Sequence, residues 1–247
     1  MQAKLIDHMG DDLKIVNAAR ASFGTKSKYE LVMHECAVVD RGFIEVLELS
    51  EKDKNLIRYL ARGIPTKEYL DLIDSFKGGV LPEATVKELL SKYRGISTHW
   101  VPFAHCYLTF EVTMPMFVKN QLIRHTIGVT VSEQSRRYVS EDPEYWFPEI
   151  TGWRIAAANV KQGSSDMVAA PVVAGDIDDA VRKHCDDATK LYRDLVDNKK
   201  IAPEMARMIL PQNMMLDWTW TLSLVTAARI CRQRLDPHAQ KEIQVLV

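Results

Sequence analysis

Residues 107–138 read YLTFEVTMPMFVKNQLIRHTIGVTVSEQSRRY, and this stretch decides the fold class. β-Branched and aromatic side chains crowd residues 107–113 and predict a strand. The apolar spacing after it predicts a helix over residues 117–125, which Gly128 breaks. Residues 129–138 predict a loop or a short strand. Because strand and helix follow one another without a βαβ rhythm, we expect an α+β fold.

Four more helices are expected outside this stretch. One begins at Asp176, which can cap it, and another begins at Pro203. The last of them is expected to be the longest and the most buried. The residue pattern places the four helices at 56–60, 176–195, 203–207 and 218–235. Residues 24–28 are expected to form a loop.

Composition sets the class of protein. The chain has 247 residues, a net charge of −1, 47% hydrophobic and 26% charged residues, which predicts a folded protein of one or two domains and excludes a disordered chain. A charge near zero argues against duplex DNA as the main partner. No apolar run is long enough to span a bilayer and no signal peptide is evident, so we expect a cytoplasmic protein, in the host cytoplasm if it is viral.

The cysteines and the missing motifs narrow the chemistry. Cys36, Cys106, Cys185 and Cys231 are widely spaced, which favours reduced thiols over a disulfide framework or a zinc site. No G-x-G-x-x-G, P-loop or G-x-S-x-G motif occurs. Any nucleotide cofactor must therefore bind in a less common manner, and no metal is expected.

The densest polar cluster lies between residues 119 and 140. Four cations, Lys119, Arg124, Arg136 and Arg137, stand against the single acid Glu133. Guanidinium groups suit phosphate oxygens, so the cluster predicts a site for an anionic ligand such as a nucleotide phosphate. A solvated basic loop with routine ion pairs is the alternative.

Two other clusters stay open on residue type alone. His99 and His105, in HWVPFAH, have a spacing that does not suit metal ligands; a structural turn or a histidine that touches a cofactor fits better. Arg229 and Arg232 share a helix face, where arginines often complement the helix dipole.

Together these blocks resemble the flavin-dependent thymidylate synthase family, also called ThyX. Six blocks occur in the family's order over almost the whole chain. The R-H and E-x-S-x-R-Y blocks make up the family signature. The six blocks are AARAS at 18–22, LIRYL at 56–60, HWVPFAH at 99–105, R-H at 124–125 with E-x-S-x-R-Y at 133–138, AR to LP at 206–211, and R to HAQ-x-E-I at 234–243.

Three positions depart from the family pattern. Thr126 stands where the signature has a second arginine, Ala104 replaces a glutamate, and Val101 replaces a threonine. The segments 62–98 and 140–175 resemble insertions. These departures are typical of a divergent, phage-like branch.

The resemblance implies a fold, an assembly and a reaction. The fold would be a single domain over residues 1–247 with mixed helices around an antiparallel-rich sheet. Active sites would lie between the subunits of a homotetramer. The reaction would be reductive methylation of dUMP to dTMP, with methylenetetrahydrofolate as carbon donor and FAD reduced by NADPH. Neither nucleic acid nor a membrane is expected as a partner.

The resemblance also implies roles for individual residues. Arg234, Ser135 and Glu133 would form the catalytic group. The dUMP site would use Gln121, Glu133, Ser135, Arg136, Arg137, Arg207 and Arg234. The FAD site would use Ser22, His99, Arg124, His125, Thr126, Glu133 and His238.

Uracil C5 must become nucleophilic for this reaction. Ser135 has no adjacent base in the sequence, and a lone serine is a poor nucleophile. We therefore expect no covalent enzyme adduct; Arg234 would polarise a uracil carbonyl and reduced flavin would deliver hydride. Three alternatives remain: a homologue that binds flavin and nucleotide without synthase activity, a nucleic-acid-binding module and an inactive scaffold.

Overall fold

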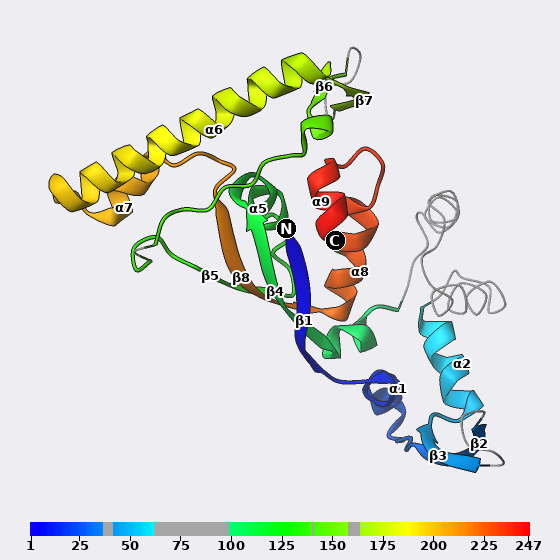
Figure 1. The fold of residues 1–247 in the computed structure, drawn as a ribbon. Coiled ribbons are helices and arrows are strands. Elements are labelled where there is room, and N and C mark those ends of the chain that lie inside the picture. Colours follow the sequence, from blue (N-terminus) through cyan, green and yellow to red (C-terminus); the bar gives the residue numbers. More distant parts are fainter. Residues whose placement is uncertain (37–41, 62–98, 140, 158–163) are drawn as a thin grey trace. The chain divides into compact units, whose positions relative to one another are not determined.

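The computed structural model describes residues 1–36, 42–61, 99–139, 141–157 and 164–247, and Figure 1 shows their elements coloured along the sequence. These residues belong to two compact units. The first comprises Met1–Asp7, Thr109–Thr221 and Arg229–Val247, and the second comprises His8–Leu108 and Leu222–Ala228. A single domain over the whole chain stays a prediction, and the expected insertion at 62–98 lies outside the described residues.

The first unit is built on a four-stranded sheet. Its strand order is β1-β4-β8-β5, with β1 at Gln2–Met9, β4 at Tyr107–Pro115, β8 at Met215–Ser223 and β5 at Val129–Glu133. Neighbouring strands in this order come from distant parts of the chain, so the sheet depends on long-range pairing. Together with the helices, this sheet confirms the predicted α+β class.

Strand β8 corrects a sequence prediction. We expected a helix over residues 218–235, but the chain is a strand to Ser223, and α8 begins only at Leu224 and ends at Arg234. The burial along β8 alternates: Leu216, Trp218 and Trp220 are buried, while the residues between them face outward. A period of two is the period of a strand, and the Thr and Trp residues favour it.

Helix α5, at Met116–Leu122, follows β4 directly and positions the basic cluster. It is shorter than expected, since Arg124 and His125 lie in the turn after it and not on the helix. Gly128 has φ of 70°, a left-handed conformation that favours glycine, and it leads into β5. Residues 129–138 thus contain the short strand that was one of the two expected outcomes.

Helix α6, at Pro171–Arg193, begins earlier than the sequence suggested. Pro171 occupies its first turn, so Asp176 lies inside the helix and does not cap it. A π-helical turn, Asp194–Asn198, extends α6, and α7 follows at Pro203–Ala206 with a 3₁₀ turn at Arg207–Ile209. Tyr192 of α6 packs into a core cluster with Ala206, Leu210 and Met214.

Short elements complete the first unit. Part of the segment 140–175, expected as an insertion, is a 3₁₀ turn and a small antiparallel hairpin. Their bounds are Ile150–Gly152 for the turn, Arg154–Ala156 for β6 and Ser164–Val168 for β7. The last helix, α9, covers Lys241–Leu246.

The second unit contains two helices and a hairpin. Helix α1, at Asp12–Arg20, is capped by Asp11, and a 3₁₀ turn follows at Ala21–Phe23. Strands β2, at Glu30–Cys36, and β3, at Gly42–Glu48, pair antiparallel. Helix α2, at Glu51–Leu60, confirms the short helix expected there, and another 3₁₀ turn covers Val101–His105.

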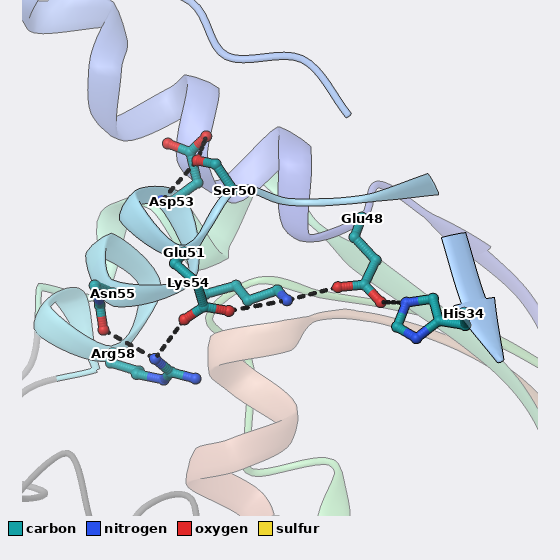
Figure 2. Close-up of polar contacts among 8 residues, drawn as sticks. All are labelled: His34, Glu48, Ser50, Glu51, Asp53, Lys54, Asn55 and Arg58. Atoms are coloured by element: carbon teal, nitrogen blue, oxygen red, sulfur yellow. Dashed lines mark hydrogen bonds and ion pairs between the residues drawn. The ribbon is translucent and has the colours of Figure 1, made fainter. Parts of the chain in front are cut away.

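A network of ion pairs joins the hairpin to α2, as Figure 2 shows. The Glu48 carboxylate contacts Lys54 Nζ at 2.7 Å and His34 Nε2 at 2.5 Å. Lys54 also contacts Glu51, which in turn contacts Arg58. The hydrogen bonds from Lys54, and then from His34, lower the pKa of Glu48. These ion pairs connect the end of β3 to the first turns of α2.

Candidate functional site

A pocket of about 360 Å³ in the first unit collects the charged side chains of the basic cluster. Residues from α5, from β5 and the turn after it, from the 3₁₀ turn at Arg207–Ile209 and from β8 line it. Its charged groups are Lys119, Glu133, Arg136 and Arg207. The rest of the lining is mainly apolar or amide side chains: Met116, Gln134, Met208, Leu210, Gln212, Met214, Met215 and Leu216.

Lys119 and Glu133 form an ion pair inside this pocket. Lys119 Nζ lies 3.0 Å from Oε1 and 3.0 Å from Oε2 of Glu133, so it contacts both carboxylate oxygens. The lysine side chain is only 14% exposed and the glutamate side chain 35%. The position of Glu133 at the end of β5 and of Lys119 on α5 brings the two together.

The two arginines of the pocket contact backbone carbonyl groups. Arg136 donates to the carbonyl oxygens of Glu141, at 2.5 Å, and Asp142, at 3.4 Å, and Arg207 donates to that of Glu204 at 3.3 Å. Among the described residues, no carboxylate lies within ion-pair distance of either arginine. Their positive charges are therefore available to an anionic ligand.

Ser135 and Arg137 lie in the turn beside the pocket without lining it. Arg137 Nε donates to Ser135 Oγ at 3.4 Å, and its guanidinium lies 5.1 Å from the centre of the Tyr138 ring. Within the described part of the chain, the side-chain contact of Ser135 is with Arg137 and not with a base. This arrangement does not activate the hydroxyl as a nucleophile.

Arg234 forms a second polar group with His125 and Gln121. Its Nε–H donates to His125 Nε2, and its Nη2 donates to the Gln121 carbonyl oxygen, both at 3.0 Å. The side chain of Gln121 donates to Gln240. Burial, and then the charge of Arg234, lower the pKa of His125, while burial, and then the charge of Arg124, lower that of Arg234. A neutral imidazole that accepts a hydrogen bond fits both directions.

The remaining expected flavin residues of the first unit are exposed. Arg124 and Thr126 lie in the turn after α5, and the His238 side chain is 88% exposed and contacts Asp236 Oδ1 at 2.9 Å. These three side chains face solvent in the isolated chain. The expected FAD set is thus divided between the two units, because Ser22 and His99 belong to the second.

A larger pocket, of about 1070 Å³, lies in the second unit. Ser22 and His99, both expected at the flavin, line it together. The His99 ring stacks on that of Tyr59, with 6.0 Å between ring centres and 12° between planes. Arg20, Phe23 and Trp100 are also part of its lining. The walls are aromatic and weakly polar, which suits a planar ligand.

Asp53 holds Arg20, one of the residues that line this second pocket. It is 4% exposed and accepts hydrogen bonds from Arg20, Ser27 and Ser50. Burial raises the pKa of the Asp53 carboxyl, but the hydrogen bonds from these three side chains outweigh it and hold the pKa below its usual value. The carboxylate therefore stays charged and holds Arg20 against the pocket wall.

The three cysteine side chains that the structure describes, Cys106, Cys185 and Cys231, line neither pocket. Cys106 and Cys185 are buried, and burial raises the pKa of both, and of Cys231. A raised pKa leaves less thiolate at neutral pH. The described residues contain no cluster of three or more His, Cys, Asp or Glu side chains arranged for a metal ion.

Sequence reasoning gave no role to Lys119, although it counted the residue among the cations. Asp53 was missed altogether. Lys119 lies on α5, which lines the pocket, and it pairs with Glu133, the only acid of the sequence cluster 119–140. The sequence alone does not indicate this pair, because it does not show that the end of β5 lies beside α5.

Comparison with known proteins places the chain among its relatives. A family model described as "Thymidylate synthase complementing protein" matches residues 4–247. The chain belongs to this family. Two relatives of the thymidylate synthase complementing protein family are named flavin-dependent thymidylate synthases. One, from Gluconobacter oxydans, is 29% identical over 98% of this chain and 62% of its own length; the other, from Thermosipho africanus, is 28% identical over 98% and 80%.

A solved structure shares the fold. The UMP/dUMP methylase PolB from Streptomyces cacaoi, bound with 5-Br UMP, gives a TM-score of 0.60 at 22% identity and covers 98% of this chain and 83% of that one. The same methylase bound with 5-Br dUMP gives a TM-score of 0.58 at 18% identity. Among the described residues of this chain, no helix has the length and apolar character needed to cross a membrane.

Proposed function

We propose that this chain is a flavin-dependent thymidylate synthase that methylates dUMP to dTMP. The observation that carries the proposal is the pocket that gathers Glu133, Arg136 and Arg207 in a chain of this family. Relatives of this chain carry the name of that activity, and a methylase with the same fold was solved with halogenated UMP and dUMP. Three cations and one carboxylate leave the pocket two positive charges, which match a phosphate monoester dianion.

The dUMP phosphate is the part of the substrate that this pocket suits. Arg207 and Arg136 offer guanidinium groups that no carboxylate in the described chain neutralises. Arg137 and Ser135 would add donors from the adjacent turn. Binding energy from the phosphate would position the uracil ring, since remote contacts can orient a reacting group.

Arg234 would act at the uracil ring. Its guanidinium keeps Nη1 outside the two hydrogen bonds to His125 and Gln121, and a donor of fixed orientation can polarise a carbonyl. Glu133 would lie between dUMP and flavin. The proposal includes no covalent adduct with the enzyme, because the contacts of Ser135 do not activate its hydroxyl and the thiols of Cys106 and Cys185 are buried.

The residues present fit a flavin. The pocket of the second unit has room for a large planar group, with the aromatic rings of Tyr59 and Trp100 and the polar groups of Ser22 and His99 in its lining. When bound, the flavin supplies the reducing equivalents for the methylation. Arg124, His125, Thr126 and His238 would contribute to holding it, NADPH would reduce it, and methylenetetrahydrofolate would give the carbon. A homotetramer with active sites between its subunits, as the resemblance to the family implies, is part of the proposal.

The test is formation of dTMP from dUMP, measured anaerobically with methylenetetrahydrofolate, NADPH and added FAD. We expect product that disappears when FAD is withheld from flavin-stripped protein. A folded chain that binds FAD and dUMP but forms no dTMP would contradict the synthase. That result would favour the flavoprotein without synthase activity, with Thr126 and Ala104 as the first positions to revert to arginine and glutamate.

A further inference from the structure

Lys119 and Glu133 raise a question about the charge of the 360 Å³ pocket. A carboxylate that lines a pocket with two arginines should pair with them, because charge-assisted pairs between arginine and carboxylate are strong. Glu133 instead has both its oxygens 3.0 Å from Lys119 Nζ. The lysine thus occupies the carboxylate that would otherwise compete with a ligand for Arg136 and Arg207.

We propose that Lys119 is a positioning residue that holds Glu133 away from the arginines and so keeps Arg136 and Arg207 available for the phosphate of the substrate. This inference rests on the proposed function, since it assigns the pocket to a phosphate monoester. Lys119 acts through Glu133 and is not itself a phosphate ligand.

Burial supports this role. The Lys119 side chain is 14% exposed, and its stem comes from α5, whose neighbours Val118 and Leu122 are buried in the core. The ammonium therefore has little freedom to leave Glu133 for a ligand. The Glu133 side chain, at 35% exposure, is the freer partner and would move if the lysine charge were removed.

Charge counting gives distinct expectations for three variants. Lys119→Met removes the cation and keeps the length of the stem, so Glu133 is released to pair with an arginine. Glu133→Gln leaves the arginines available. The double variant Lys119→Met/Glu133→Gln removes both charges and restores the two positive charges that the pocket has in the natural chain.

The experiment measures the dissociation constant of dUMP by calorimetry on the full-length, flavin-loaded protein. We expect Lys119→Met to weaken dUMP binding about tenfold or more, as loss of a charge-assisted contact does. The double variant should bind dUMP more tightly than Lys119→Met does, because no carboxylate at position 133 is left to pair with Arg136 or Arg207. Lys119→Arg, which can still pair with Glu133, should stay close to the natural chain.

Two controls separate this role from a structural one. Deoxyuridine lacks the phosphate, so its binding should change little in Lys119→Met. Lys183→Met removes a lysine–carboxylate pair on the exposed surface of α6, where Lys183 Nζ lies 2.5 Å from Asp187, and should leave dUMP binding unchanged. A thermal melt of each variant checks that it is folded.

Three results would overturn the inference. If the double variant binds dUMP as weakly as Lys119→Met, then Lys119 contacts the phosphate directly. If Lys119→Met binds dUMP as the natural chain does, the ion pair has no effect on the ligand. In either of these two cases, formation of dTMP by the natural protein would still support the proposed function. If the natural protein binds no dUMP, both the proposed function and the role of Lys119 are overturned.

Discussion

Arg234 donates its Nε–H to Nε2 of His125 across 3.0 Å, so an arginine expected at the substrate holds a histidine expected at the flavin. The contact needs a neutral imidazole, because a protonated ring has no lone pair to accept the hydrogen bond. It gives a direct physical link between the two groups of site residues in the first unit.

We expect this contact to break on acidification. Burial and the charge of Arg234 lower the pKa of His125, so the folded chain binds this proton less readily than the unfolded chain. The contribution of the neutral ring is complete above about pH 6.5, the usual histidine value, and is lost as the pH falls from there through the lowered pKa. Histidine ring signals followed by NMR during a pH titration would report the midpoint.

The same titration on Arg234→Gln tests the cause. Removing the guanidinium charge should move the His125 midpoint upward, toward the usual value. A midpoint in the natural chain at or above that value would contradict the lowered pKa of His125.

Arg207→Ala should weaken dUMP binding about tenfold or more and leave deoxyuridine binding nearly unchanged. The reason is that Arg207 lines the charged pocket, and its only described partner is the Glu204 carbonyl. Calorimetry with both ligands measures the difference. Arg232→Ala is the matched control, since Arg232 is an exposed arginine of α8 outside the pocket lining. An equal loss of affinity for dUMP and for deoxyuridine would contradict a contact between Arg207 and the phosphate.

Ser135→Ala should keep dTMP formation at saturating dUMP while raising the dUMP concentration needed for half-maximal rate. The serine contacts Arg137 and no base in the described chain, so its loss disturbs binding more than chemistry. Steady-state kinetics separate the two effects. Complete loss of turnover with normal dUMP binding would mean that the hydroxyl takes part in the reaction.

Asp53→Asn should destabilise the second unit by about 2 kcal/mol, because a buried carboxylate that accepts hydrogen bonds from three side chains is replaced by an amide. Thermal or urea unfolding measures this loss. The pKa of Asp53 is lowered, so its stabilisation is present above about pH 3.9 and is lost as the pH falls through the lowered value. Asp187→Asn, at an exposed carboxylate of α6, should leave the melting temperature unchanged. Equal melting of both variants would show that the Asp53 contacts add no stability.

The sequence patterns located local elements better than their ends. The strand at β4 was predicted from its β-branched and aromatic residues, and the helix at α2 from the near-helical spacing of its apolar residues. The helix predicted over residues 218–235 was wrong over its first third, residues 218–223. Trp218 and Trp220 were taken as part of an apolar helix, whereas their alternation with threonine belongs to a strand that packs beside β4 in the sheet order. The local apolar content is compatible with both a helix and a strand here, and pairing with the rest of the sheet determines that the segment is a strand.

The sequence predicted the types of residue in the candidate site better than it predicted which of them lie together. Glu133, Arg136 and Arg207 were expected together and do share a pocket. Arg137 and Ser135 lie beside it, and Arg234 pairs with His125 instead. The conformation of the turn after β5 determines that Arg136 lines the pocket while Ser135 and Arg137 do not. The spacing of these residues along the chain does not predict that difference.

The cations of the 360 Å³ pocket come from positions 119, 136 and 207, on separate elements of one unit. Only folding brings them close together, so the unfolded chain has no comparable site. A dianion that binds only to the folded chain must therefore stabilise it. At a free dianion concentration of one hundred times its dissociation constant, the free energy of unfolding would rise by about 2.7 kcal/mol. Ligand supply and resistance to unfolding are coupled in this molecule through the same three side chains.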